Sequence, residues 1–191
     1  MCQKIILIRH ASIEPEYSGR YIGSTDPPLG EIGIKQAKAL AEHIKFKESF
    51  CSPLKRAQQT ARLMGIDKIE TDADLREIDF GKWEGKTFDE IKIFDPQLVS
   101  CWAEYETNFA FPGGESIEHF LQRVHRAGDR LANNPADTVL VVTHGGVIRS
   151  LICYFLGLPS RNYLLFDVKP ASITTIELFN GKGVLAGLEN L

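Results

Sequence analysis

Four side chains that could bind and transfer phosphate follow the ends of short apolar segments. Residues 4–8 (KIILI) lead directly into Arg9 and His10. Residues 138–143 (TVLVVT) lead in the same way into His144. Short apolar, β-branched runs of this kind are typical of buried strands, so we expect these three groups where strands end.

A third apolar run, at residues 46–51, leads into a segment that carries Arg56, the fourth of these groups. The carboxyl ends of parallel strands share one edge of a sheet, so parallel pairing of the three runs would bring all four side chains together. Arginine forks match phosphate oxygens, and the starts of the following helices add free backbone N–H groups. A neutral imidazole can attack phosphorus and split one displacement into two easier ones. We therefore predict phosphoryl transfer through a phosphohistidine on His10.

A leaving alkoxide needs a proton, and the loop from Leu75 to Gly85 offers carboxylates for this purpose. Glu77 is the preferred candidate, as a general acid first and then as a base for the hydrolytic water, while Asp79 and Glu84 are its rivals. The arginines would supply the positive charge, and His144 has no second histidine at the spacing of a metal pair. The sequence contains neither a Walker P-loop nor an H-E-x-x-H motif. We expect no metal and no cofactor.

Apolar runs alternate with longer amphipathic segments, and this alternation predicts the elements that position the groups. Strands are expected at residues 4–8, 46–51, 66–71, 138–143, 172–179 and 184–188. Helices are expected at residues 31–44, 53–64, 115–133 and 145–156, and over 87–105 with a break at Pro96. Ser52 and Pro53 would be the N-cap and the first residue of the second helix. The pattern predicts an α/β fold, a three-layer α/β/α sandwich with a mostly parallel central sheet, in a single domain over residues 1–191.

The bulk composition is that of an ordinary globular chain and restricts its partners. The 191 residues are 43% hydrophobic and 25% charged, which is usual for a folded domain. A formal net charge of -3 gives no reason to expect a nucleic acid or a membrane as a partner. The four cysteines form no C-x-x-C pair, and no apolar stretch reaches the ~20 residues of a membrane span. We expect a cytoplasmic protein that binds a small-molecule phosphate ester, and the sequence leaves a homodimer open.

Six motifs, in order along the chain, resemble those of the histidine phosphatase superfamily, the phosphoglycerate mutase-like fold. They are Leu7-Ile8-Arg9-His10, Gly19 through Leu29 with Gly33, Ser52 through Ala61, Leu75 through Gly85, Pro112 through Ser116, and Val142 through Gly146. Each motif is weak alone, but together they cover nearly the whole chain. The catalytic set that the resemblance implies is His10 as nucleophile, Glu77 as proton donor, and Arg9, Arg56 and His144 around the phosphate. The implied substrate-binding set adds Arg20, Gly23 and Gly145 to these five residues.

Departures from the family pattern bear on the substrate. Ala11-Ser12 replaces the usual Gly-Glu after the Arg-His pair, and Glu16 aligns with a frequent phosphate-contacting asparagine, although its charge would repel phosphate. The segment 86–111 is short compared with the mutase insertion and contains no arginine, and the chain stops soon after its last strand. These features favour a phosphatase over a mutase.

Three hypotheses follow from this resemblance. The leading one is a metal-independent phosphomonoesterase. Residues 19–29 look most like the loop of the α-ribazole phosphatases, which would make α-ribazole 5′-phosphate of cobalamin biosynthesis the substrate. The alternatives are a cofactor-dependent phosphoglycerate mutase and a catalytically silent phosphoester-binding module.

Overall fold

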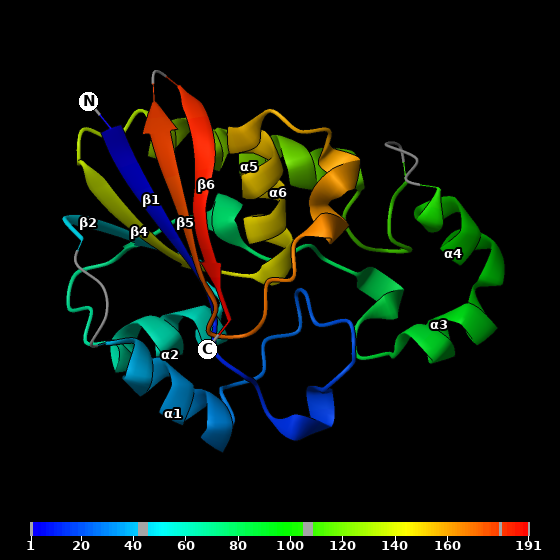
Figure 1. Ribbon diagram of the computed structural model, residues 1–191. Helices are drawn as coiled ribbons and strands as arrows, with labels where there is room; N and C mark the ends of the chain where they lie inside the picture. The colour runs from blue at the N-terminus through cyan, green and yellow to red at the C-terminus, as the bar shows by residue number, and fades with distance from the viewer. Residues whose placement is uncertain (1, 42–45, 105–108, 180, 191) are drawn as a thin grey trace.

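A six-stranded sheet forms the centre of the computed structural model, which describes residues 2–41, 46–104, 109–179 and 181–190. The strands are β1 (Cys2–Arg9), β2 (Glu48–Cys51), β3 (Glu70–Thr71), β4 (Thr138–Thr143), β5 (Ile173–Phe179) and β6 (Lys182–Glu189). They lie in the order β3-β2-β4-β1-β5-β6. The strands β1, β2, β3 and β4 pair with one another in parallel, whereas β5 is antiparallel to its neighbours β1 and β6 (Figure 1). The predicted mostly parallel sheet is therefore confirmed.

Helices cover both faces of this sheet, which gives the predicted three layers. α1 (Glu31–Leu40) and α2 (Lys55–Leu63) pack on one face, and α5 (Ile117–Ala132) and α6 (Gly145–Leu156) pack on the other (Figure 1). α3 (Phe88–Phe94) and α4 (Pro96–Ala103) lie to one side of the sheet. Short 3-10 turns occur at η1 (Pro15–Tyr17), η2 (Ala73–Leu75), η3 (Gly81–Trp83) and η4 (Ser160–Leu165).

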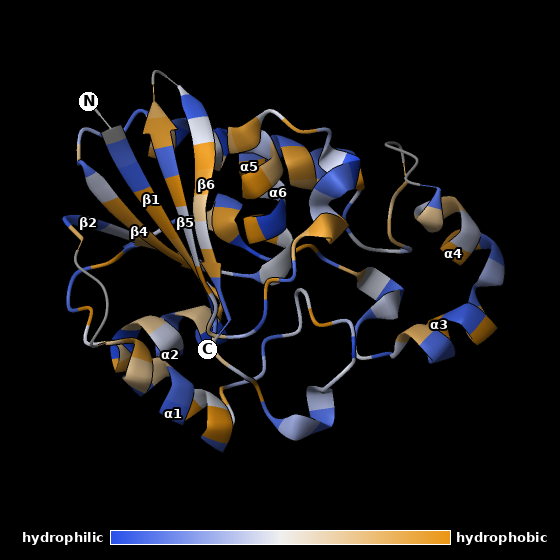
Figure 2. Ribbon diagram, viewed as in Figure 1, coloured by the Kyte–Doolittle hydropathy of each residue, from blue (hydrophilic) through white to orange (hydrophobic). Residues whose placement is uncertain are grey.

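The alternation of side chains along β1 explains why this strand is apolar without interruption. Ile5 and Leu7 belong to the hydrophobic cluster formed with α5 and α6, whereas Ile6 and Ile8 belong to the cluster formed with α1 and α2. Successive residues of a strand point to opposite faces, so a strand covered on both sides needs apolar residues at every position. Each such buried side chain contributes about 1.5–3 kcal/mol. The orange stretches of β1 and β4 in Figure 2 show this pattern.

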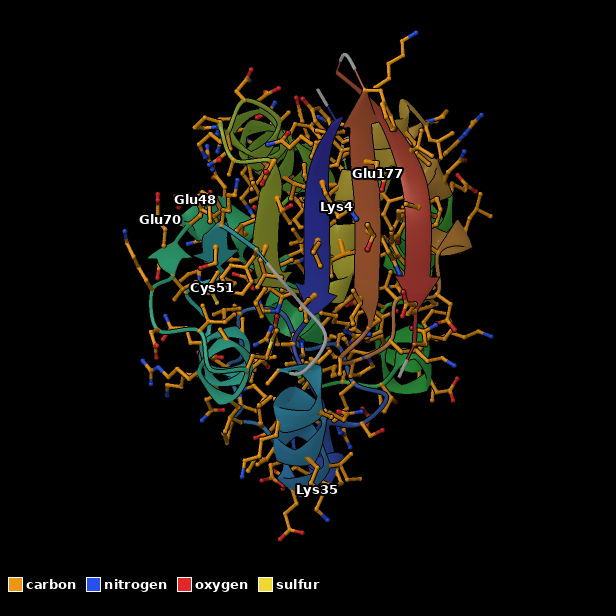
Figure 3. All side chains as sticks on the ribbon, turned by 60° about the vertical axis from the view of Figure 1, so that its left-hand side comes forward. Lys4, Lys35, Glu48, Cys51, Glu70 and Glu177 are labelled. Atoms are coloured by element: carbon orange, nitrogen blue, oxygen red, sulfur yellow. The ribbon has the colours of Figure 1, made fainter. Side chains whose placement is uncertain are left out.

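The face that carries α1 and α2 is covered mainly near the carboxyl ends of the strands. Lys4 on β1 and Glu177 on β5 pair across the strands on this face, with 3.7 Å between Lys4 Nζ and Glu177 Oε1. Figure 3 shows both side chains in front of the sheet, with α1 and α2 below them. A partly exposed pair of this kind contributes at most about 1 kcal/mol. The packed end of this face is therefore the end where Arg9 and His144 emerge.

Some predicted boundaries differ from the structure. α2 begins at Lys55 with Leu54 in the N-cap position, so the predicted Ser52 cap and the predicted first helical residue, Pro53, are both wrong. The reason is that the Ser52 hydroxyl lies 2.7 Å from His144 Nε2, and the chain turns for two more residues before the helix starts. α1 ends at Leu40, and predicted helical residues 42–44 lie outside the described residues. The expected strand at 66–71 is reduced to its last two, exposed residues.

Candidate active site

The carboxyl ends of β1 and β4 bring two histidines into contact. Arg9 pairs with Thr143 across the two parallel strands, and the backbone N–H of His10 donates to the Thr143 carbonyl at 2.8 Å. Each histidine is the first residue beyond its strand. Their ring centroids are 5.1 Å apart, with 59° between the planes. Parallel pairing therefore produces the meeting of His10 and His144 that the sequence predicts.

The His10 side chain is held as a neutral imidazole with one free nitrogen. It is 6% exposed, and its Nδ1 lies 2.9 Å from the Ala11 carbonyl oxygen. A carbonyl only accepts hydrogen bonds, so Nδ1 carries the proton and Nε2 keeps its lone pair. Burial, and then the charges of Arg56 and Arg9, hold the pKa of His10 well below 6.5. The ring is thus neutral at neutral pH and can act as a nucleophile.

The His144 side chain is fully buried. Its Nε2 lies 2.7 Å from Ser52 Oγ, while its Nδ1 has no hydrogen-bond partner among the described residues. Burial holds the pKa of His144 well below 6.5, and the charges of Arg56 and Arg9 act in the same direction. His144 is therefore also neutral at neutral pH.

The Arg56 guanidinium is fully buried beneath the loop that follows η1. Its Nη1 donates to the Thr25 carbonyl at 2.8 Å, and its Nη2 donates to the Gly23 carbonyl at 2.9 Å. Asp26 Oδ1 lies 3.4 Å from Nη1. Burial lowers the pKa of Arg56, although Glu77 and Asp26 partly oppose this effect. The backbone carbonyls fix the plane of the group and leave its Nε without a partner among the described residues.

Arg9 is fixed in a comparable way. Its Nη1 donates to the Val168 carbonyl at 2.7 Å, and its Nε is buried with no partner in the described part of the chain. Burial lowers its pKa to about 10, so the group remains charged at neutral pH.

The nitrogens without partners point to an anion site. Arg9, His10 and Arg56 line a pocket of about 220 Å³, which we call the histidine pocket. Arg9 Nε, Arg56 Nε and His144 Nδ1 are three of the buried side-chain atoms that lack a partner within the described residues. Leaving a buried polar group unpaired costs about 1–3 kcal/mol, so such groups call for an explanation. Oxygens of a phosphoryl group bound next to His10 would pair with N–H groups of Arg9 and Arg56, which line the histidine pocket. His144 lines neither pocket and adjoins this site through its ring contact with His10.

Of the three carboxylates considered as proton donors, Glu77 is the one that reaches this site. Its Oε1 accepts from the Ile78 N–H and its Oε2 from the Gly146 N–H, both at 3.1 Å, and it lines the histidine pocket. Asp79 accepts from Ser24 Oγ at 2.9 Å, and Glu84 binds backbone N–H groups of the loop above Arg56. Both rivals of Glu77 are therefore occupied in holding loops.

A second pocket, of about 320 Å³, extends from Arg9 and Glu77 and is called here the aromatic pocket. Its apolar walls include Tyr21, Phe80, Trp102, Phe111, Phe120 and Leu121. Polar groups are contributed by Arg149, Ser150 and Tyr163. The two pockets share Arg9 and Glu77, so a phosphate ester next to His10 could extend its leaving group into the aromatic pocket.

Comparison with known proteins gives the same family as the sequence motifs. The family model of the histidine phosphatase superfamily (branch 1) matches residues 5–191. The chain belongs to the histidine phosphatase superfamily. Its predicted fold and family are thereby confirmed.

Several relatives of this histidine phosphatase are phosphatases by name. Phosphoserine phosphatase 1 of Hydrogenobacter thermophilus is 33% identical, over 97% of this chain and 91% of the relative. Adenosylcobalamin/α-ribazole phosphatase of Salmonella typhimurium is 32% identical, over 98% and 96%. The crystal structure of the α-ribazole phosphatase from Shigella flexneri superposes with a TM-score of 0.88 at 30% identity, over 98% and 96% of the two chains. The chain spans about half the length of three mycobacterial relatives that are 35% identical to it.

The other residues singled out in the sequence lie in different places in this histidine phosphatase. Arg20 lines both pockets, and its Nη1 donates to Glu90 Oε2 at 3.1 Å. Gly145 lines the aromatic pocket next to Arg9. Gly23 lies outside the lining of both pockets and holds Arg56 through its carbonyl. Glu16 is exposed and lines neither pocket, so its charge does not face the phosphate site.

Sequence reasoning missed Arg123, which supports the Glu77 loop from α5. The guanidinium is 5% exposed and forms a bidentate pair with Glu115, at 2.7 and 2.8 Å. Its Nη1 donates to the carbonyls of Asp74 and Arg76, and its Nη2 donates to that of Glu77 at 3.1 Å. The helical spacing gave one signal, since Arg123 falls among the apolar positions of an amphipathic helix.

Glu84 has a comparable supporting role for the loop that binds Arg56. Its carboxylate accepts from the N–H groups of Gly23, Ser24 and Thr25 at 2.9 to 3.2 Å, and from that of Phe80 at 3.1 Å. The carbonyls of the same loop bind Arg56, so Glu84 fixes the frame in which Arg56 sits.

No cluster of His, Cys, Asp or Glu side chains in the described part of the chain could hold a metal ion. No helix formed by the described residues is long and apolar enough to cross a membrane.

Proposed function

We propose that the protein hydrolyses phosphomonoesters through a phosphohistidine on His10. The observation that carries this proposal is the convergence of a neutral His10 with buried, unpartnered nitrogens of Arg9, Arg56 and His144. In the first step His10 Nε2 attacks phosphorus while the bond to the ester oxygen breaks. Glu77 carries a proton at this stage and donates it to the leaving oxygen.

The second step releases phosphate. The Glu77 carboxylate takes a proton from water, the hydroxide attacks phosphorus, and the bond to His10 Nε2 breaks. Inorganic phosphate leaves, and His10 and protonated Glu77 are restored. Arg9 and Arg56 stabilise the charge on the equatorial oxygens in both steps because their orientation is fixed before the substrate arrives.

The aromatic pocket supports a leaving group with a flat apolar part, and α-ribazole 5′-phosphate is our preferred substrate. A benzimidazole base would bury apolar surface against walls such as Phe80, Trp102 and Phe120. The resemblance of residues 19–29 and the names of two relatives support the same substrate class. On this proposal the protein acts in the cytoplasm on a small molecule and needs neither nucleic acid nor a membrane.

One observation favours a second substrate class. Arg149 donates from Nε to the Phe166 carbonyl at 2.9 Å, and its terminal nitrogens form no hydrogen bond with the described residues. A guanidinium fork at the wall of the aromatic pocket would suit a carboxylate on the leaving group, as in phosphoserine.

A substrate panel in the presence of EDTA tests both parts of the proposal. We expect turnover of p-nitrophenyl phosphate that survives chelation and is lost in His10→Ala, and an acid-labile phosphoenzyme in rapid-quench samples. Comparison of α-ribazole 5′-phosphate, phosphoserine, sugar phosphates and 3-phosphoglycerate ranks the leaving groups. A rate that depends on added metal would refute the mechanism, and efficient interconversion of phosphoglycerates would favour a mutase.

A further inference from the structure

Ser52 lies directly next to His144, and the mechanism above gives it no role. It follows β2, and its backbone N–H donates to the Val142 carbonyl at 3.0 Å, which continues the pairing of β2 with β4. Its side chain is fully buried. The backbone therefore fixes the Ser52 hydroxyl 2.7 Å from His144 Nε2.

The hydrogen of this hydroxyl can be placed by counting donors and acceptors. Ser52 Oγ accepts a hydrogen bond from the Leu54 N–H at 3.3 Å. A hydroxyl also donates one hydrogen, and His144 Nε2 is the acceptor within reach among the described residues. If Nε2 carried a proton instead, the buried Ser52 hydrogen would have no acceptor there, at a cost of about 1–3 kcal/mol.

We propose that Ser52 is a positioning residue that holds the proton of His144 on Nδ1. The Ser52 O–H donates to Nε2, so the single proton of the neutral ring lies on Nδ1. Nδ1 is the nitrogen that has no partner among the described residues, whereas Nε2 contacts Ser52. His144 therefore meets the phosphoryl oxygens as a hydrogen-bond donor, a consequence that rests on the proposed function, whereas the proton position does not.

The two histidines thus have the same tautomer for opposite purposes. The Ala11 carbonyl fixes the proton of His10 on Nδ1, which leaves Nε2 free to attack. Ser52 fixes the proton of His144 on Nδ1, which presents a donor. With the proton on Nε2, a lone pair of His144 would face the phosphate oxygens and repel them. In other enzymes too, a hydrogen-bond partner of one ring nitrogen determines which nitrogen of a catalytic histidine carries the proton.

Nitrogen-15 NMR of the full chain tests the proton position directly. In long-range ¹H–¹⁵N spectra at neutral pH, we expect a protonated, pyrrole-type Nδ1 and an unprotonated Nε2 for His144. Comparison with the spectrum of His144→Gln assigns the signals. A protonated Nε2 in the native protein would overturn the proposal, whatever the enzyme's activity.

Ser52→Ala tests the consequence for catalysis. Loss of one preorganised donor to a transition state costs about 10²–10³-fold in kcat, and a tautomer that is no longer fixed should cost about 10- to 100-fold. We expect this loss in kcat with a smaller change in KM, and a parallel loss of affinity for orthovanadate, which resembles the transition state. Ser52→Thr keeps the hydroxyl and should retain most of the activity.

The outcomes separate the inference from the proposed function. An unprotonated Nε2 in the native protein, with a proton shared between both nitrogens in Ser52→Ala, supports the role of Ser52. Native-like kcat and vanadate affinity in a folded Ser52→Ala variant would refute that role. If the native protein hydrolyses no phosphate ester, the proposed function fails while the NMR result still decides the tautomer.

Discussion

Gly146 lies between Glu77 and the start of α6, and one added methyl group there tests whether Glu77 donates the proton. A Cβ at position 146 would lie 2.5 Å from Glu77 Oε1, about 0.9 Å closer than the 3.4 Å at which ordinary contact begins. The carboxylate must therefore move by roughly 1 Å, and a misplacement of this size can cost about 100-fold in rate. Alanine favours a helix over glycine by about 1 kcal/mol, so the substitution should not unfold α6.

The expected loss depends on the leaving group. Gly146→Ala should lower kcat/KM about 100-fold for an alkyl phosphate, because an alkoxide needs the proton of Glu77. It should affect p-nitrophenyl phosphate only a few-fold, because nitrophenolate leaves without a proton. Glu77→Gln should show the same contrast. Gly145→Ala gives the comparison, since its Cβ would lie 3.4 Å from Arg9 and any loss should be equal for both substrates. Equal losses for the two substrates in Gly146→Ala would refute Glu77 as the proton donor.

Three further results are expected. His10 and His144 take up protons near pH 6.5 in the unfolded chain, whereas in the folded chain they do not. The free energy of unfolding, measured in urea, should therefore fall below that pH by up to about 1.4 kcal/mol per pH unit for each histidine. A flat profile from pH ~7.5 to ~5.5 would contradict this expectation. Arg123→Met should lower the free energy of unfolding by up to about 3–5 kcal/mol because it leaves the partly buried Glu115 carboxylate without its cation. Arg126→Ala, an exposed control on the same helix, should change the free energy of unfolding by less than about 1 kcal/mol, with both variants measured by urea unfolding. Arg149→Gln should lower kcat/KM about 10-fold more for phosphoserine than for α-ribazole 5′-phosphate, and equal effects would exclude a carboxylate partner.

Elements with strong local signals lie at their predicted limits. Residues 138–143 form β4 and residues 145–156 form α6, as the apolar run and the terminal Gly157 indicate. The predicted start of α2 is wrong because its expected cap, Ser52, forms a hydrogen bond with a residue 92 positions away. No local pattern reports such a competitor.

The supporting residues were missed for a related reason. Arg123 and Glu84 have the appearance of ordinary charged residues of a helix and a loop. Their roles arise because α5 packs across η2 and because residues 23–25 lie over Glu84. Both contacts join segments more than 40 positions apart, so they exist only once the chain has folded.

The sequence by itself determined which reactive groups the protein has and on which strand ends they lie. Arg9, His10, Arg56 and His144 meet because parallel strands share a carboxyl edge, and that rule needs only the order of strands and helices along the chain. The tertiary structure decided the chemical state of these groups. Burial makes both histidines neutral, and contacts with the Ala11 carbonyl and the Ser52 hydroxyl determine which nitrogen of each ring carries the proton. Protonation depends on the surrounding charges, solvent and hydrogen-bond partners, and most of these are set by residues distant in the chain.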